Sequence, residues 1–135
     1  MAIKGLSLDE TVDYISQFDK DDPKVTWILG VLSSRVRKHI GDIATSFNPG
    51  SPNSSSFNIG RAEIEAVSFG LKGFKNFVDS KEKPIKFETE KKNIGDKAYF
   101  VVADKIIDVI PPEVITELAV KIMGLNKLSE DERKN

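Results

Sequence analysis

Three short stretches of the chain hold side chains whose types and spacing suggest chemistry. The first is the acidic run at residues 19–22, which offers the carboxylates of Asp19, Asp21 and Asp22 as calcium ligands. The calcium loop of helix–loop–helix proteins also needs glycine at its sixth position and glutamate at its twelfth. Counted from Asp19, those positions hold Lys24 and Gly30. We therefore interpret this run as a solvated acidic turn and expect neither a metal nor another cofactor.

The second stretch contains Ser34 and His39, which could pair as a nucleophile and a base. His39 is the only histidine and there is no cysteine, which excludes a two-histidine metal site, a thiolate zinc site and a cysteine nucleophile. No carboxylate in the sequence pattern is placed to orient the histidine, and no nucleophile-elbow pattern surrounds any serine. We expect His39 to be structural, no residue to be catalytic, and the protein to be non-enzymatic.

The third stretch, at residues 70–73, reads Gly-Leu-Lys-Gly and matches the G-x-x-G loop with which KH domains clamp single-stranded nucleic acid. Its neighbours Phe69 and Phe74 are typical of a core. The 20 basic residues are balanced by 21 acidic ones, so the chain lacks the surplus of positive charge that contacts with a phosphate backbone require. A KH-like module that binds nucleic acid is kept as one alternative, although we do not expect nucleic acid as a partner.

The elements that must position these residues fit one domain. A chain of 135 residues with 39% hydrophobic residues can form one core. Its longest apolar stretches are about eight residues, whereas a helix that crosses a bilayer needs roughly 20. The start also lacks the apolar run of a secretory signal. We therefore expect no membrane partner.

The N-terminal part is acidic and predicts a hairpin. Residues 11–18 alternate between the two faces of a strand, and residues 25–32 form a compact run of β-branched and aromatic side chains. The turn residues between them give the hairpin a long tip. A helix over residues 8–18 is the alternative, because Ser7 and Glu10 have the spacing of a capping box.

Two helices are predicted next, separated by a flexible loop. The first begins at Ser33 or Ser34, which can cap it, and places apolar residues on one face up to Phe47. Residues 48–57 are rich in serine, proline and asparagine and predict a flexible loop. The second helix spans residues 59–78, and its apolar stripe is Ile64, Val67, Leu71, Phe74 and Val78. Gly70 and Gly73 within it allow a kink or a break.

The C-terminal part predicts a second strand pair and two further helices. Strands are expected at residues 84–89 and 98–102, with a turn at 93–96. Asp104 can cap a short helix that extends to residue 110, and Pro112 can lie in the first turn of the next, which Gly124 would end. Residues 129–135 form a polar tail. The fold class is therefore α+β, one domain at residues 1–135 with about four strands in two hairpins and three to four helices.

A binding protein of this kind would use an exposed apolar patch rimmed by charge. The candidate side chains are aromatic residues that lie beside the main apolar stripes or in the loop. Each of them is also compatible with an ordinary place in the core. These candidate partner-binding residues are Trp27, Phe57, Phe69 and Phe77.

The second half of the chain resembles a known group of proteins. The segment GLKGFKNFVD at residues 70–79 is followed by KPIKFET at residues 83–89. An Ile-Pro-Pro-Glu segment at 110–113 opens the last helix, and the chain ends with LNKLSEDERKN at 125–135. Together, residues 69–135 resemble small proteins from the structural gene clusters of tailed bacteriophages, and are most similar to tail assembly chaperones.

This resemblance implies a non-enzymatic helper in bacteriophage morphogenesis. Such chaperones bind the tape-measure protein in the host bacterial cytoplasm while tail-tube subunits assemble around it, and many are made in two lengths by ribosomal frameshifting. The partners would be phage tail or neck proteins, with a homo-oligomer as a further option. The alternative is a structural protein of the virion, a head–tail connector or neck protein, which would remain in the mature particle.

Overall fold

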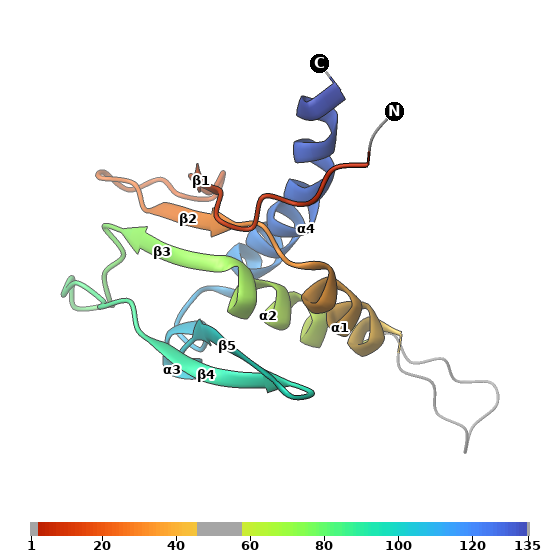
Figure 1. Ribbon diagram of the computed structural model, residues 1–135. Helices are drawn as coiled ribbons and strands as arrows, with labels where there is room; N and C mark the ends of the chain where they lie inside the picture. The colour runs from red at the N-terminus through yellow and green to blue at the C-terminus, as the bar shows by residue number, and fades with distance from the viewer. Residues whose placement is uncertain (1–2, 46–57, 135) are drawn as a thin grey trace, which may run out of the picture.

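The computed structural model describes residues 3–45 and 58–134, with side chains in the last helix described up to Leu125. It has an α+β fold with two small antiparallel sheets, and α2 lies between them (Figure 1). The predicted fold class is confirmed. The elements are β1 (Thr11–Tyr14), β2 (Thr26–Gly30), α1 (Ser34–Ala44), α2 (Ile59–Gly70), β3 (Leu71–Lys75), β4 (Thr89–Ile94), β5 (Lys97–Val102), α3 (Asp104–Ile107) and α4 (Pro112–Lys134).

The first sheet has the strand order β1-β2-β3, and both pairs are antiparallel. Val12 lies opposite Leu29, and Tyr14 lies opposite Trp27. Directly opposed residues point to the same face of a sheet, so Val12 and Tyr14 face the side on which Leu29 and Trp27 are buried. The predicted N-terminal hairpin is confirmed, and the alternative helix over residues 8–18 is wrong.

Helix α1 begins as its sequence predicts. The hydroxyl of the N-cap residue Ser33 accepts a hydrogen bond from the backbone N–H of Val36 at 3.2 Å, which satisfies one first-turn donor. Val36 and Ile40 are buried on its inner face. Phe47 and the loop at 48–57 lie outside the described residues.

The predicted long helix at residues 59–78 is wrong beyond Gly70. Helix α2 ends there, and β3 begins at the next residue without a loop. Within β3, Phe74 pairs with Trp27, and Gly73 lies opposite Ile28. Pairing with β2 satisfies the backbone groups of residues 71–75, and this tertiary gain outweighs the helical spacing of their apolar side chains. Of that predicted stripe, Ile64 and Val78 are exposed.

The second hairpin is present, and β5 confirms the strand predicted at residues 98–102, but its first strand begins at residue 89 rather than at 84. Pro84 forms only an isolated bridge with Val78, and β4 begins at Thr89. The ring of Phe87 packs on that of Phe74 with centroids 5.3 Å apart, so Phe87 joins the aromatic side chains of the first sheet rather than a strand ladder. The predicted turn is present, with Gly95 at φ 59° between β4 and β5.

Two helix boundaries near the C-terminus also differ from the prediction. Asp104 is the first residue of α3, whose N-cap is Ala103 and whose last residue is Ile107. Helix α4 begins at Pro112 as predicted but continues through Gly124 to Lys134. Leu125 is 3% exposed, so its burial offsets the roughly 1 kcal/mol that glycine costs inside a helix. The side chains of the tail at 129–135 lie outside the described part.

One core joins both sheets and all four helices in the described part of the chain. Its fully buried members come from five elements, with α2 packed against α1, α4 and β5. They are Leu29, Val67, Val102, Ile106, Leu118 and Ile122.

Candidate functional site

A groove of about 580 Å³ lies between the end of β1 and the outer face of α4. The two walls come from residues about a hundred positions apart in the chain. Its lining combines apolar, charged and amide side chains, namely Tyr14, Gln17, Phe18, Glu113, Thr116, Glu117, Val120 and Lys121. The fold therefore creates this groove only when the N-terminal hairpin docks on α4.

Glu117 connects the two walls of the groove by hydrogen bonds. Its Oε2 accepts hydrogen bonds from the Tyr14 hydroxyl at 2.7 Å and from the backbone N–H of Gln17 at 2.9 Å. Lys121, one helical turn further along α4, places its Nζ 5.8 Å from the centre of the Tyr14 ring. These contacts hold residues 14–17 against α4 and set the shape of the groove.

The same contacts shift two pKa values. Burial is the largest single effect on the pKa of Glu117 and would raise it, but Ser16, Gln17 and Tyr14 together lower it below the ordinary value of 4.5. Oε1 of Glu117 is buried and has no hydrogen-bond partner among the described residues. The pKa of Tyr14 is raised above 10.0, chiefly because its hydroxyl donates to Glu117. At neutral pH the site thus holds a carboxylate and a neutral phenol.

Two apolar side chains at this groove stay in contact with water. Phe18 is 50% exposed and Val120 is 68% exposed, whereas large apolar residues usually lie inside. Oε2 of Glu117 is already occupied by two donors of the chain itself. The groove is therefore suited to holding an apolar group of a partner, with Glu113 and Lys121 at its rim.

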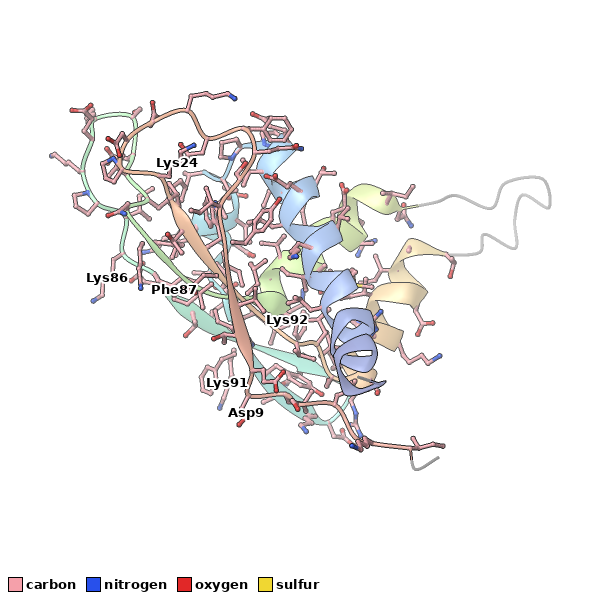
Figure 2. All side chains as sticks on the ribbon, turned by 90° about the horizontal axis from the view of Figure 1, so that it is seen from above. Asp9, Lys24, Lys86, Phe87, Lys91 and Lys92 are labelled. Atoms are coloured by element: carbon pink, nitrogen blue, oxygen red, sulfur yellow. The ribbon has the colours of Figure 1, made fainter. Side chains whose placement is uncertain are left out.

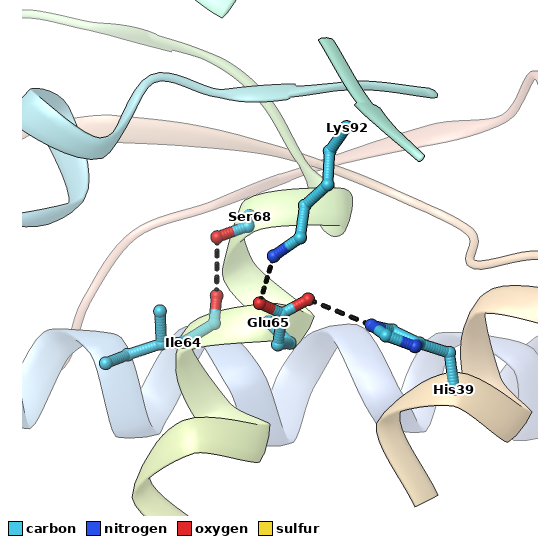
Figure 3. A network of polar contacts seen from close by, with 5 residues as sticks. All are labelled: His39, Ile64, Glu65, Ser68 and Lys92. Atoms are coloured by element: carbon cyan, nitrogen blue, oxygen red, sulfur yellow. Dashed lines mark hydrogen bonds and ion pairs between the residues drawn. The ribbon is translucent and has the colours of Figure 1, made fainter. Parts of the chain in front are cut away.

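A second cluster joins α1, α2 and β4 through a single carboxylate (Figure 3). Glu65 accepts from His39 Nε2 at 3.3 Å with one oxygen and from Lys92 Nζ with the other. The Glu65 side chain is 14% exposed, so its charge is largely screened from water by these partners. The ring of Phe69 packs beside both, 6.0 Å from the His39 ring centre and 5.9 Å from Lys92 Nζ.

Glu65 is the carboxylate beside His39 that the sequence pattern did not identify. Ser34 and His39 line the same shallow hollow at α1. The described contacts of these two residues include no hydrogen bond between them, and His39 Nε2 is directed at Glu65. The cluster ties the second hairpin to the helices, and it does not assemble a serine nucleophile with its base.

The G-x-x-G stretch does not form the loop that a KH domain requires. Gly70 ends α2, and residues 71–73 belong to β3. Lys72 extends its stem across Gly30 and donates from Nζ to the carbonyl oxygen of Phe69 at 3.0 Å. Although the side chain as a whole is exposed, partial burial of its ammonium group lowers the pKa. The KH-like interpretation of these residues is therefore wrong.

Of the aromatic residues singled out from the sequence, the three that the structure describes do not form an exposed patch. Trp27 is 2% exposed and Phe69 is 4% exposed, so both belong to the core. Phe77 is half-buried, with its ring centre 4.9 Å from that of Trp27. Phe57 lies outside the described residues. Side chains of this size bury the most apolar surface when they pack in the core, which explains their positions.

The groove residues were missed because each is unremarkable in the sequence. One signal was present on α4, where an outer stripe of polar residues contains a single valine. The stripe consists of Glu113, Thr116, Glu117, Val120 and Lys121, which recur at helical spacing. Phe18, at the border of a strand and an acidic turn, was the matching signal on the other wall.

The described part of the chain holds neither a metal-binding cluster nor a helix that could cross a membrane. Among the side chains that the structure describes, at residues 3–45 and 58–125, no group of three histidine or acidic residues is placed to hold a metal ion. Within the same residues, no helix has the length and apolar character to cross a membrane. Comparison with protein-family models, with curated proteins and with solved structures finds no match to this chain.

Proposed function

We propose that this chain is a non-enzymatic bacteriophage morphogenesis protein, similar to tail assembly chaperones, which binds a tape-measure or tail protein in the groove between β1 and α4. The observation that carries the binding role is the exposure of Phe18 and Val120 on the two walls of one groove. The phage assignment is supported by the resemblance of residues 69–135 to tail assembly chaperones.

The arrangement of titratable groups favours binding over catalysis. Glu65 and Glu117 are half-buried carboxylates, and each is already engaged by donors of the chain itself. A general base must be within reach of a substrate proton, and these carboxylates instead connect elements of the fold. An exposed apolar groove held open by such connections is a surface for a partner.

The test uses cells in which the phage that encodes this chain is being assembled. A tagged chain is recovered from the lysate, and purified particles are analysed beside it by mass spectrometry. We expect the tape-measure or another tail protein to co-purify, and we expect the chain to be absent from particles. A fixed copy number per particle would instead support the connector alternative, and failure to recover any phage protein would refute the proposal.

A matched pair of variants links this test to the groove. Val120→Glu places a charge on the groove, and Val109→Glu makes the same change at a valine that is 54% exposed and does not line it. We expect recovery of the tail protein to fall only with Val120→Glu. Equal recovery with both variants would show that binding uses another surface.

A further inference from the structure

The groove continues at an open sheet edge. Among the described residues, β1 has one neighbouring strand, β2, so its other side is an edge of the three-stranded sheet. Thr11, Val12 and Asp13 are exposed. An edge strand presents backbone N–H and C=O groups that can pair with a strand from another chain. This edge is therefore able to receive an extended segment.

A strand added at this edge would reach the groove with every second side chain. Val12 and Tyr14 face the side of the sheet on which α4 packs, and Tyr14 itself lines the groove. A neighbouring strand lies about 4.8 Å away and points alternate side chains to the same face. Those side chains would pass Tyr14 and meet Phe18 and Val120.

The charge around β1 specifies the rest of the partner. Residues 9–22 contain six acidic side chains and one lysine, a formal charge of −5. Glu113 adds an exposed carboxylate on the α4 wall. In the view of Figure 2, Lys91 is drawn beside Asp9, and Lys86 lies well away from α4. Lys24 donates from Nζ to the carbonyl oxygen of Asp19, and with this lysine included residues 9–24 still carry a formal charge of −4. A basic segment is complementary to this surface.

We propose that an extended, basic segment of a partner protein pairs with β1 and places alternate apolar side chains against Phe18 and Val120. The inference rests on the proposed function and specifies the chemistry of the partner at the same groove. Backbone pairing supplies affinity that is independent of sequence, and the apolar groove and the acids beside it supply specificity.

The test uses the full chain and three labelled peptides of about ten residues, measured by fluorescence anisotropy. The first alternates lysine with valine and threonine. The second has the same composition rearranged to the spacing of an amphipathic helix, and the third replaces lysine with glutamate. We expect the alternating basic peptide to bind most tightly and its affinity to decrease with added salt. Tighter binding of the helical rearrangement, equal binding of all three, or no binding overturns the inference.

Variants and hydrogen exchange locate the peptide. Val120→Ser should weaken binding by about tenfold, because it removes the apolar contact without adding a charge, whereas Val109→Ser should leave binding unchanged. Backbone amides of residues 11–14 should exchange more slowly when the peptide is bound. Unchanged exchange in β1, or equal effects of the two variants, also contradicts the inference.

The remaining outcomes separate this inference from the proposed function. Failure of the peptides together with recovery of a tail protein from lysate refutes the extended basic segment and leaves the phage role standing. Peptide binding without recovery of any phage protein refutes the phage role and leaves the extended basic segment standing. A dimer that forms with increasing concentration and is lost with Val120→Glu would identify a second copy of this chain as the occupant and overturn the inference.

Discussion

Replacement of Gly70 by alanine tests the close contact between the last residue of α2 and α4. A Cβ at position 70 would lie 2.5 Å from Cγ2 and 2.8 Å from Cδ1 of Ile122. Ile122 is 0% exposed, so the side chains packed around it leave no space into which it could move. Overpacking of a core costs about 1–3 kcal/mol, and the preference of a helix for alanine returns at most about 1 kcal/mol. We expect Gly70→Ala to lower the free energy of unfolding by about 1–2 kcal/mol.

Urea denaturation and thermal melting measure this effect. A loss of this size lowers the melting temperature by roughly 4–8 °C in a domain of this length. Gly41→Ala is the matched control, because Gly41 lies inside α1 and a Cβ there would meet nothing within 4 Å. This control should gain about 0.5–1 kcal/mol.

A double-mutant cycle identifies the contact itself. Ile122→Ala alone should cost about 2–5 kcal/mol because it leaves a cavity. In the presence of Gly70→Ala the new methyl group partly fills that cavity, so the double variant should be more stable than the sum of the two changes by about 1–3 kcal/mol. Additive effects, or a Gly70→Ala protein as stable as the parent, would refute the steric argument.

Three further changes test other contacts. Glu65→Gln should reduce the free energy of unfolding by about 1–3 kcal/mol, because Lys92 loses a charged acceptor at a site that is only 14% exposed; a change below about 0.5 kcal/mol in urea denaturation would contradict the role of this network. Tyr14→Phe should cost about 1 kcal/mol at neutral pH. Because the pKa of Glu117 is lowered and that of Tyr14 is raised, the difference from the parent should shrink as pH falls below 4.5 and as it rises above 10.0; a difference independent of pH in denaturation series would refute this coupling. Ser33→Ala should cost about 0.5–2 kcal/mol through loss of the α1 cap, whereas Ser33→Gly should cost only a few tenths; equal losses in thermal melts would show that the hydroxyl does not act as a cap.

The sequence predicted those parts of the fold whose signals are local. The N-terminal hairpin follows from strand alternation, the start of α1 from a capping serine, and the start of α4 from Pro112. Each of these features depends on residues within a few positions of one another. The α+β class could be predicted because apolar residues follow the period of a strand in some segments and the period of a helix in others.

The wrong boundaries share a different physical cause. Residues 71–75 have helical spacing of apolar side chains, but their backbone pairs with β2, more than forty residues earlier. Gly124 carries the usual signal for the end of a helix, yet the buried Leu125 keeps α4 continuous. In both cases a tertiary contact outweighs a local preference of about 1 kcal/mol, and such a contact is not encoded in any short window of the chain.

The candidate site was also missed because it depends on tertiary contacts. In addition, the residue types chosen as binding candidates were those that the core buries. Sequence reasoning selected the largest aromatic residues as binding candidates, but Trp27 and Phe69 pack inside because their burial stabilises the fold most. What stays exposed at the groove is a phenylalanine at the end of a hairpin and one valine on a polar helix face. Glu117 joins these two walls through Tyr14, 103 residues away. A binding surface of this kind is therefore found by asking which apolar side chains the finished core leaves outside, a question that requires the three-dimensional contacts.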